Sequence, residues 1–277
     1  MKNALRWTLI IICIAAFCYS AYMLLSTAFE YKKAENFYDQ TALQYTAPAP
    51  PKVVAPEQPT AGTLPDLTQP PHTETKLPTA DDTSDGENEP PIVIDFDSLL
   101  ATNSDVIGWL YSEGTVINYP IARAEDNDKY LHHMIDGSYN SSGTLFMDYR
   151  CKGDFTSGNS VIYGHNMKNG SMFHSLVDYE EQAYYDEHPS MYLLTPDQNY
   201  ILHVISGFVI GADSWVYQFD LAEDGAREAF LSQCIANSSF QADYTPTESD
   251  RIVTLSTCTY DYSNARYVII GALSPIN

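Results

Sequence analysis

The sequence predicts a mostly β domain with a few helices, folded as a closed and largely antiparallel barrel, behind a membrane-spanning helix and a disordered tether. Three features of the 277 residues predict this organisation. A charge-free apolar run stands near the N-terminus, a proline-rich stretch follows, and residues 92–277 contain many short β-forming runs separated by Gly, Asn, Asp and Ser. Helices do not alternate regularly with these β-forming runs. This arrangement favours a barrel over a parallel βαβ sheet.

The apolar run extends from Trp7 to Phe29 and is long enough to cross a bilayer as one helix. Lys2 and Arg6 precede it, so the positive-inside rule predicts a cytoplasmic N-terminus and an extracellular remainder. A cleaved signal peptide is the alternative, but its apolar core is typically only ~7–15 residues long. We therefore expect residues 1–29 to form a cytoplasmic stub and a single, uncleaved transmembrane anchor.

Residues 30–91 are expected to form an extracellular tether rich in Pro, Thr and acidic residues. Eleven of the 16 prolines lie between Thr46 and Pro91, with almost no aromatic residues among them. Such a composition buries too little apolar surface to offset the loss of chain entropy on folding. The segment is therefore predicted to be disordered and partly extended, and to hold the following domain away from the membrane.

Residues 92–277 are long enough to bury one sizeable core. A helix is expected to begin near Asp95, because acidic residues occupy the first turn. A longer helix is expected over Ala222–Ala236, where apolar side chains recur at three-to-four spacing. The remaining runs are β-rich, and the clearest of them are Val116–Ile121, Gly143–Tyr149, Ser160–Tyr163, Tyr200–Ile210, Arg251–Cys258 and Arg266–Leu273.

The composition excludes several classes of partner. A formal charge of −22 argues against binding to nucleic acid and against broad adsorption to an anionic membrane surface. Of the five cysteines, Cys13 and Cys18 lie in the apolar run, and the other three leave at least one free thiol. No group of Cys, His or acidic residues has the spacing of metal ligands, so neither a metal nor another cofactor is expected.

The last two predicted strands carry a candidate nucleophile. Cys258 ends one strand, and Arg266 begins the next after seven intervening residues. If these strands pair as a hairpin, the two side chains lie at the same end of the sheet. His165 follows the end of another strand, directly after Gly164, which permits a close turn of the backbone. A thiol paired with a histidine becomes a nucleophile, and an arginine can donate to the oxyanion of an attacked carbonyl.

Each of these side chains also has a purely structural interpretation. A cysteine in an apolar strand is more often a small core residue than a nucleophile. A single histidine after a strand is often only a satisfied structural group, and Arg266 could pair with one of the many acidic residues. The periodicity alone does not bring His165 and Cys258 together, because they are 93 residues apart.

Longer motifs decide between the two interpretations. Residues 254–258 (TLSTC), followed by Arg266 at the start of a strand, resemble the active-site signature of the sortases. Residues 163–173 (YGHNMKNGSMF) are similar to the histidine segment of class B sortases. Three further blocks resemble class B sequences in the expected order, namely residues 117–121 (INYPI), 126–131 (DNDKYL) and 143–150 (GTLFMDYR). The resemblance covers essentially all of residues 92–277 and implies a closed barrel of about eight strands, with helices at its N-terminus and before the last two strands.

The resemblance implies a cysteine transpeptidase. Cys258 would attack the Thr carbonyl of a C-terminal sorting signal in a secreted protein and form a thioacyl enzyme. An amine of the peptidoglycan precursor, or of another protein, would then attack the thioacyl enzyme and release the joined product. His165 would act as general acid and base, and Arg266 would position the substrate and stabilise the oxyanion. The matching blocks imply that Asn127, Leu131 and Ser256 lie in the substrate groove. The resemblance implies no metal site.

Several other residues are weighed in the same way. Asp261 is the first acid after the cysteine, but Thr259 directly follows Cys258, which puts an auxiliary role for Asp261 in doubt. The adjacent His132 and His133 are expected to be ordinary surface or groove residues, pointing to opposite faces of a strand. Cys234 is expected to be a buried structural thiol on its helix. Cys151 follows Arg150 near a predicted loop, and the sequence leaves its exposure open.

Three alternative functions remain open at this point. One is a sortase that polymerises pilus subunits, although no obvious lid segment with a plug motif is found before the barrel. Another is a cysteine peptidase or amidase that only hydrolyses, which requires water to outcompete amines at the thioacyl stage. The third is an anchored binding module that has kept the barrel and lost the chemistry. Residues 92–277 alone are expected to be soluble and active on peptides.

Overall fold

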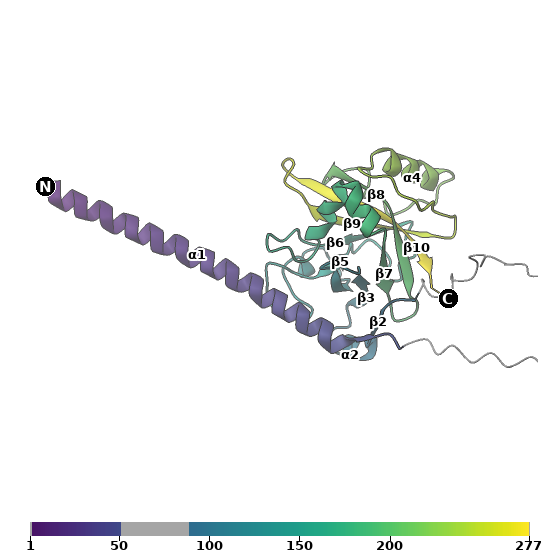
Figure 1. Cartoon of the computed structure of the whole chain (residues 1–277), viewed down its shortest axis with the longest axis horizontal. Coiled ribbons are helices and arrows are strands. Elements are labelled where there is room, and N and C mark those ends of the chain that lie inside the picture. Colours follow the sequence, from purple (N-terminus) through teal and green to yellow (C-terminus); the bar gives the residue numbers. More distant parts are fainter. Residues whose placement is uncertain (1, 51–88, 277) are drawn as a thin grey trace, which may run out of the picture.

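The computed structural model describes residues 2–50 and 89–276. A single long helix leads from the N-terminus to a β-barrel, against which its last part packs (Figure 1). This helix, α1, extends from Lys2 to Tyr45. It contains neither glycine nor proline, the residues that most often break or kink helices.

The segment directly after the predicted anchor differs from the expectation. Residues 30–45, predicted as the start of the tether, belong to α1 and lie against the barrel. The chain then forms strand β1 (Thr46–Pro48), which pairs antiparallel with β2 (Ile92–Ile94). The tether prediction for residues 51–88 lies outside the described residues.

Eight strands close into the barrel, in the order β10-β8-β7-β3-β4-β5-β6-β9. The pairs β4–β5 and β6–β9 are parallel and the others are antiparallel. The fold class predicted from the sequence is therefore confirmed. The strands are β3 (Val106–Tyr111), β4 (Asn118–Ala122), β5 (Leu145–Met147), β6 (Asn159–Tyr163), β7 (Ser190–Leu194), β8 (Tyr200–Gly211), β9 (Arg251–Cys258) and β10 (Ala265–Pro275).

Short helices connect and cover the strands. Asp95 caps α2 by accepting a hydrogen bond from the backbone N–H of Ser98, as the acidic first turn suggested. The longest helix of the barrel domain, α4, precedes β9 and β10 as predicted, although it begins at Ala226 and not at Ala222. The helices after α1 are α2 (Phe96–Thr102), η1 (Lys129–Leu131), η2 (His174–Glu180), α3 (Gln182–Glu187) and α4 (Ala226–Ala236).

The core consists of side chains that alternate along the strands toward the barrel interior and toward its covering helices. Cys234 is fully buried between α4 and the barrel, as predicted. Cys151, whose exposure the sequence left open, is buried, and its sulfur accepts a hydrogen bond from the backbone N–H of Val161. Burial raises the pKa of both thiols. Neither thiol therefore has the character of a nucleophile.

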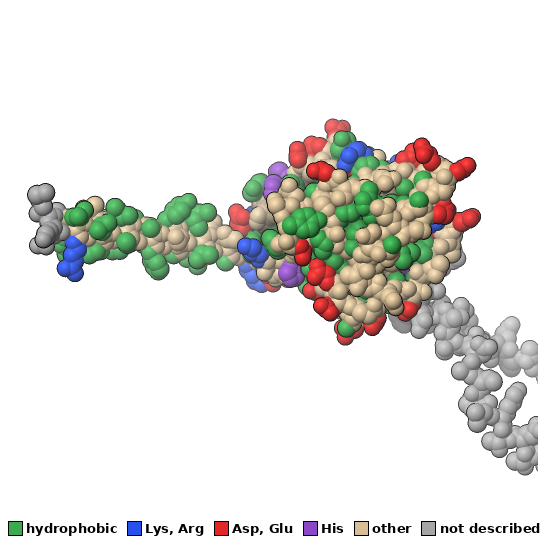
Figure 2. All heavy atoms as spheres, turned by 90° about the horizontal axis from the view of Figure 1, so that it is seen from above, with side chains coloured by type: hydrophobic (Ala, Val, Ile, Leu, Met, Phe, Trp, Pro, Cys, Tyr) green, Lys and Arg blue, Asp and Glu red, His purple; other side chains and the backbone are tan. Residues whose placement is uncertain are grey.

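The C-terminal part of α1 packs on the barrel through one stripe of its surface. Its buried residues are Ala34, Tyr38, Thr41 and Tyr45, which recur at intervals of three or four. The Tyr38 hydroxyl donates to the carbonyl oxygen of Gly143 and contacts the Thr144 hydroxyl. In Figure 2, hydrophobic side chains surround the free part of the helix, whereas acidic side chains are spread over the barrel.

Candidate active site

The register of the last hairpin places the predicted nucleophile beside the predicted cation. β9 and β10 pair antiparallel, and Cys258 lies directly opposite Arg266. The loop between them contains Asn264, whose backbone adopts a left-handed conformation (φ 62°), which asparagine tolerates well. The expected hairpin geometry is confirmed, and both side chains are at the same end of the barrel.

The parallel pairing of β6 with β9 brings His165 to the same end. Tyr163 lies opposite Ser256, and the chain beyond β6 follows the last residues of β9. The backbone N–H of Gly164 donates to the Ser256 carbonyl oxygen (3.1 Å). The Asn166 amide donates to the carbonyl oxygen of Cys258 (2.8 Å). His165 is therefore fixed between two residues that are each bonded to the end of β9.

Gly164 is required here by close packing and not by an unusual backbone angle. A Cβ atom at this position would stand 2.5 Å from Cδ2 of Phe173 and 2.6 Å from Cδ2 of Leu145. Real Cβ atoms essentially never approach other atoms this closely. The glycine before the histidine thus lets the backbone lie directly against the core.

All six residues predicted for the site line one cavity of about 330 Å³. Phenyl and phenol rings of Phe146, Tyr163 and Tyr217 form part of its wall, and the rings of Tyr163 and Tyr217 are 6.2 Å apart. The predicted residues among its lining are Asn127, Leu131, His165, Ser256, Cys258 and Arg266.

The imidazole of His165 is held by one hydrogen bond to the backbone. Its Nε2 lies 2.7 Å from the carbonyl oxygen of Leu131, which can only accept, so Nε2 carries the proton. Nδ1 is then the nitrogen that can accept a proton. Burial lowers the pKa of His165, the bond to Leu131 opposes this effect, and the nearby His132 adds to it. The imidazole is therefore kept neutral near pH 7.

His132 lies closer to the site than the sequence suggested. It follows η1 in a loop, not in a strand, and its ring stacks on that of His165 with centroids 5.9 Å apart. His133 instead bonds the carbonyl oxygen of Lys129 through Nδ1. His132 is exposed beside the groove, which agrees with its interpretation as a surface or groove residue, whereas the expectation that the two histidines lie on a strand is wrong.

A buried carboxylate, Asp148, supports the side of the cavity that Asn127 lines. It accepts hydrogen bonds from the Asn127 amide (3.0 Å), the Tyr163 hydroxyl (3.0 Å) and two nitrogens of Arg150 (2.7 and 2.8 Å). Burial alone raises the pKa of Asp148, but these donors outweigh it and hold the pKa below its ordinary value. Sequence reasoning missed Asp148, although an acid inside the apolar block of residues 143–150 was a signal.

Further polar groups fix the other walls. The hydroxyls of Ser256 and Tyr217 are hydrogen-bonded (3.0 Å). Asn166, which holds the Cys258 carbonyl, is itself bonded through Oδ1 to Nδ1 of His174 (2.7 Å). Asp261 is exposed, and its carboxylate accepts a hydrogen bond from the Thr259 hydroxyl. It is not among the residues that line the cavity of Cys258.

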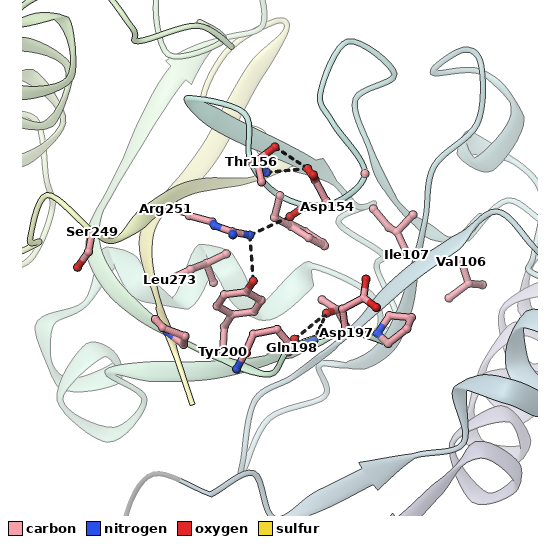
Figure 3. A pocket seen from close by; sticks show the side chains of 15 residues that line it. Val106, Ile107, Asp154, Thr156, Asp197, Gln198, Tyr200, Ser249, Arg251 and Leu273 are labelled. Atoms are coloured by element: carbon pink, nitrogen blue, oxygen red, sulfur yellow. Dashed lines mark hydrogen bonds between the residues drawn. The ribbon is translucent and has the colours of Figure 1, made fainter. Parts of the chain in front are cut away.

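A second cavity of about 660 Å³ lies at the opposite end of β9. It is lined by the first residue of that strand, Arg251, whereas Cys258 is the last. Arg251 points toward Tyr200 and the Asp154 backbone and donates to both (2.9 Å each; Figure 3). Neither cysteine nor histidine is among the residues that line this cavity. It offers no thiol paired with a histidine, so we place the candidate site in the cavity of Cys258.

Comparisons with known proteins identify the family of the chain. A family model described as "Sortase domain" matches residues 113–274. Sortase B of Listeria monocytogenes is 35% identical over 177 residues, which cover 63% of this chain and 72% of that protein. Among solved structures, a Staphylococcus aureus sortase B-substrate complex matches with a TM-score of 0.62 and 29% identity, covering 66% of this chain and 85% of the other.

A Bacillus anthracis sortase B structure also matches, with a TM-score of 0.60 and 35% identity over 65% of this chain and 84% of that one. The barrel, the order of its motifs and these relatives agree with one another. The chain belongs to the sortase family of cysteine transpeptidases and, within it, resembles the sortase B proteins.

Proposed function

We propose that the chain cleaves the C-terminal sorting signal of secreted proteins after Thr and joins the new end to an amine of the cell wall. One observation carries the proposal: the thiol of Cys258, the imidazole of His165 and the guanidinium of Arg266 line one cavity. The related Staphylococcus aureus structure is a substrate complex, which supports a bound substrate as the occupant of this cavity.

In the proposed reaction, His165 accepts the proton of the Cys258 thiol at Nδ1. The thiolate sulfur attacks the Thr carbonyl carbon, and the Arg266 guanidinium donates to the oxyanion that forms. When this intermediate collapses, the peptide C–N bond breaks and the leaving amine takes the proton from His165. The acceptor amine then attacks the thioester and gives a proton to the same imidazole, and the Cys258 thiolate leaves as a new amide forms.

The remaining lining residues would bind the peptide. Asn127 and Ser256 offer polar groups on two sides of the cavity, and Leu131 offers an apolar contact beside the bond to His165. The hydrogen bond that Asn127 donates to Asp148 and the one between the Tyr217 and Ser256 hydroxyls hold both polar groups in place before substrate arrives.

We also propose that α1 crosses the membrane once, with its N-terminus in the cytoplasm. The helix contains an 18-residue window with a mean hydropathy of 2.2, and none of that window is buried in the described structure. Lys2 and Arg6 precede the apolar run, which supports a cytoplasmic N-terminus and an extracellular barrel.

The experiment is a peptide-library assay with the full chain in detergent micelles. Peptides with a central Thr and varied neighbours are incubated with several amines, and the products are identified by mass spectrometry. We expect amine-dependent ligation by the natural chain and none by Cys258→Ala. The matched control is Cys13→Ala, which removes an exposed thiol on α1 and should leave activity unchanged.

Two outcomes decide the proposal. Ligation by Cys258→Ala would contradict the mechanism, whereas formation of only the free acid at every amine concentration would identify a hydrolase. Arg266→Ala, which removes the guanidinium, tests the oxyanion contact separately. Removal of one such donor typically lowers kcat by ~10²–10³-fold, and a smaller effect would exclude Arg266 from this role.

A further inference from the structure

The helix α1 joins the proposed membrane span to the barrel without a break. Its 44 residues form one helix, and Figure 1 shows it running straight from the N-terminus to the barrel. Sharp kinks in helices arise mainly at Pro, at Gly/Ser pairs or at local bulges, and α1 has neither Pro nor Gly. A continuous helix of this kind fixes both the distance and the orientation of the barrel relative to the proposed span.

Contact between α1 and the barrel begins where the apolar run ends. The carbonyl oxygen of Glu30 accepts a hydrogen bond from the Asn140 amide (3.1 Å), and the buried stripe starts at Ala34. Since a helix rises about 1.5 Å per residue, the first buried contact lies only about 7–8 Å beyond Phe29. The barrel therefore stands directly at the end of the proposed span.

The part of the barrel that contacts this end of α1 also supports the catalytic histidine. The backbone N–H of Asn140 donates to the carbonyl oxygen of His132, whose ring stacks on His165. The preceding residue, Leu131, accepts the hydrogen bond from His165 Nε2. One short segment, residues 131–140, thus has the catalytic groove on one side and α1 on the other.

The loop between β9 and β10 points in the same direction. In Figure 1 this loop extends from the barrel on the side toward which α1 leaves, whereas the C-terminal end of β10 lies on the opposite side. Cys258 and Arg266 are at the loop end of these strands. The cavity of Arg251 is at the other end, about 23 Å away along β9 if each residue rises about 3.3 Å.

The proline-rich segment does not connect the span to the barrel in this arrangement. Pro48 pairs with Ile92, and the backbone N–H of Ala49 donates to the carbonyl oxygen of Pro91 (2.9 Å). The two ends of the segment are therefore adjacent, and both lie beyond the part of α1 that packs on the barrel. Its length cannot set the distance between the membrane and the active site.

We propose that the groove-bearing end of the barrel faces the bilayer that α1 spans, at a short height fixed by α1, so that the enzyme acts on peptides held at the membrane surface. This proposal rests on the membrane crossing proposed above. It assigns the bilayer as the neighbour of the face formed by residues 131–140 and the β9–β10 loop. It also means that residues 30–91 do not act as the flexible spacer between membrane and barrel that their composition suggested.

The orientation can be tested without activity. A fluorophore is attached to Tyr260→Cys in the β9–β10 loop, or to Asp197→Cys beside the far cavity, in full-length chains reconstituted into lipid vesicles; both residues are exposed. Cys13, Cys18 and Cys258 are replaced by Ala in these chains. Quenching by a lipid-bound quencher should be several-fold stronger at position 260 than at position 197. Equal quenching, or stronger quenching at position 197, would overturn the proposal.

The fixed height is tested by changing α1 in the natural chain. An 18-residue alanine-based helical insert after Phe29 adds five turns, so it raises the barrel by about 27 Å without rotating it. We expect turnover of a lipid-anchored peptide to fall at least tenfold and turnover of the same peptide in solution to stay unchanged. A matched 18-residue Gly/Ser insert, which lets the barrel return to the surface, should restore most of the anchored rate.

Removal of residues 52–88, with a short Gly/Ser turn in their place, should leave both rates unchanged. The proposal is overturned if this deletion lowers the anchored rate alone, or if the helical insert has no effect on it. Failure of the natural chain to cleave the soluble peptide would instead contradict the proposed function, and the quenching result would still decide the orientation.

Discussion

Tyr38 on α1 offers a direct test of whether this helix is part of the folded domain. Its side chain is 5% exposed, and its ring packs edge-on against Tyr119 with centroids 5.3 Å apart. Its hydroxyl donates to the carbonyl oxygen of Gly143 and contacts the Thr144 hydroxyl. Burial raises the pKa of Tyr38, so the phenol stays protonated and donates at every working pH.

Two substitutions separate the hydroxyl from the ring. Tyr38→Phe leaves buried acceptors without their donor and should lower the free energy of unfolding by about 1–3 kcal/mol. Tyr38→Ala also leaves a cavity and should cost about 3–5 kcal/mol. In a domain of this size, 1 kcal/mol lowers Tm by about 2–4 °C, so the expected shifts are about 2–12 °C and 6–20 °C.

The assay is thermal unfolding of the full chain in detergent micelles, followed by near-ultraviolet circular dichroism, which reports aromatic packing in the barrel. Leu43→Ala is the matched control, because Leu43 lies on the same helix and is 83% exposed. Its free energy of unfolding should change by no more than about 0.5 kcal/mol. If Tyr38→Ala unfolds at the same temperature as Leu43→Ala, residues 30–45 do not belong to the folded unit.

The same reasoning changes the expectation for a truncated domain. Residues 92–277 lack Tyr38 and also β1, the partner of β2. We therefore expect residues 30–277 to be more stable than residues 92–277. The original prediction that residues 92–277 suffice for a soluble, active enzyme remains to be tested by this comparison.

Three further predictions concern the site. Asp148→Asn removes the charge that holds Asn127 and Arg150, so KM for the peptide should rise and the free energy of unfolding should fall by about 1–3 kcal/mol; an unchanged KM in steady-state kinetics would separate Asp148 from the groove. Asn166→Ala frees the Cys258 carbonyl and should lower kcat about tenfold at constant KM, and an equal change in both would contradict a positioning role. Burial lowers the pKa of His165 and of His203, so near pH 6 the unfolded chain binds more protons than the folded chain. Stability, measured by urea unfolding, should therefore fall as the pH decreases from about 7 to 5, and His203→Gln should reduce this dependence.

The hairpin of the active site could be predicted from local rules. Alternation along Arg251–Cys258 and a seven-residue connection were enough to place Cys258 and Arg266 at one end of the sheet, as the register has them. His165 could be added only through resemblance to a family. Its proximity depends on the parallel pairing of β6 with β9, and no local pattern encodes a contact between strands so far apart in the chain.

The N-terminal boundary could not be read from the sequence for a different physical reason. The apolar run ends at Phe29, but the helix continues to Tyr45. A helix that lies against a protein needs apolar residues only on the side that it buries. The stripe that packs on the barrel includes Ala34 and Thr41, which carry weak hydropathy signals. Asp148 was missed because its role depends on Asn127 and Tyr163, two donors that come together with it only in the folded barrel.

The closure of the barrel by its final strands has a consequence for the order of folding. β10 pairs with both β8 and β9, and β9 pairs with β6, so His165 and Cys258 meet only when the last two strands dock. Pairings between segments distant in sequence form late, and chains begin to fold from the end that is synthesised first. A nascent chain that has reached β8 contains His165, but it lacks both the thiol and the strand β9 to which the neighbours of His165 are bonded. The candidate site is therefore complete only after β9 and β10 have been synthesised and have docked.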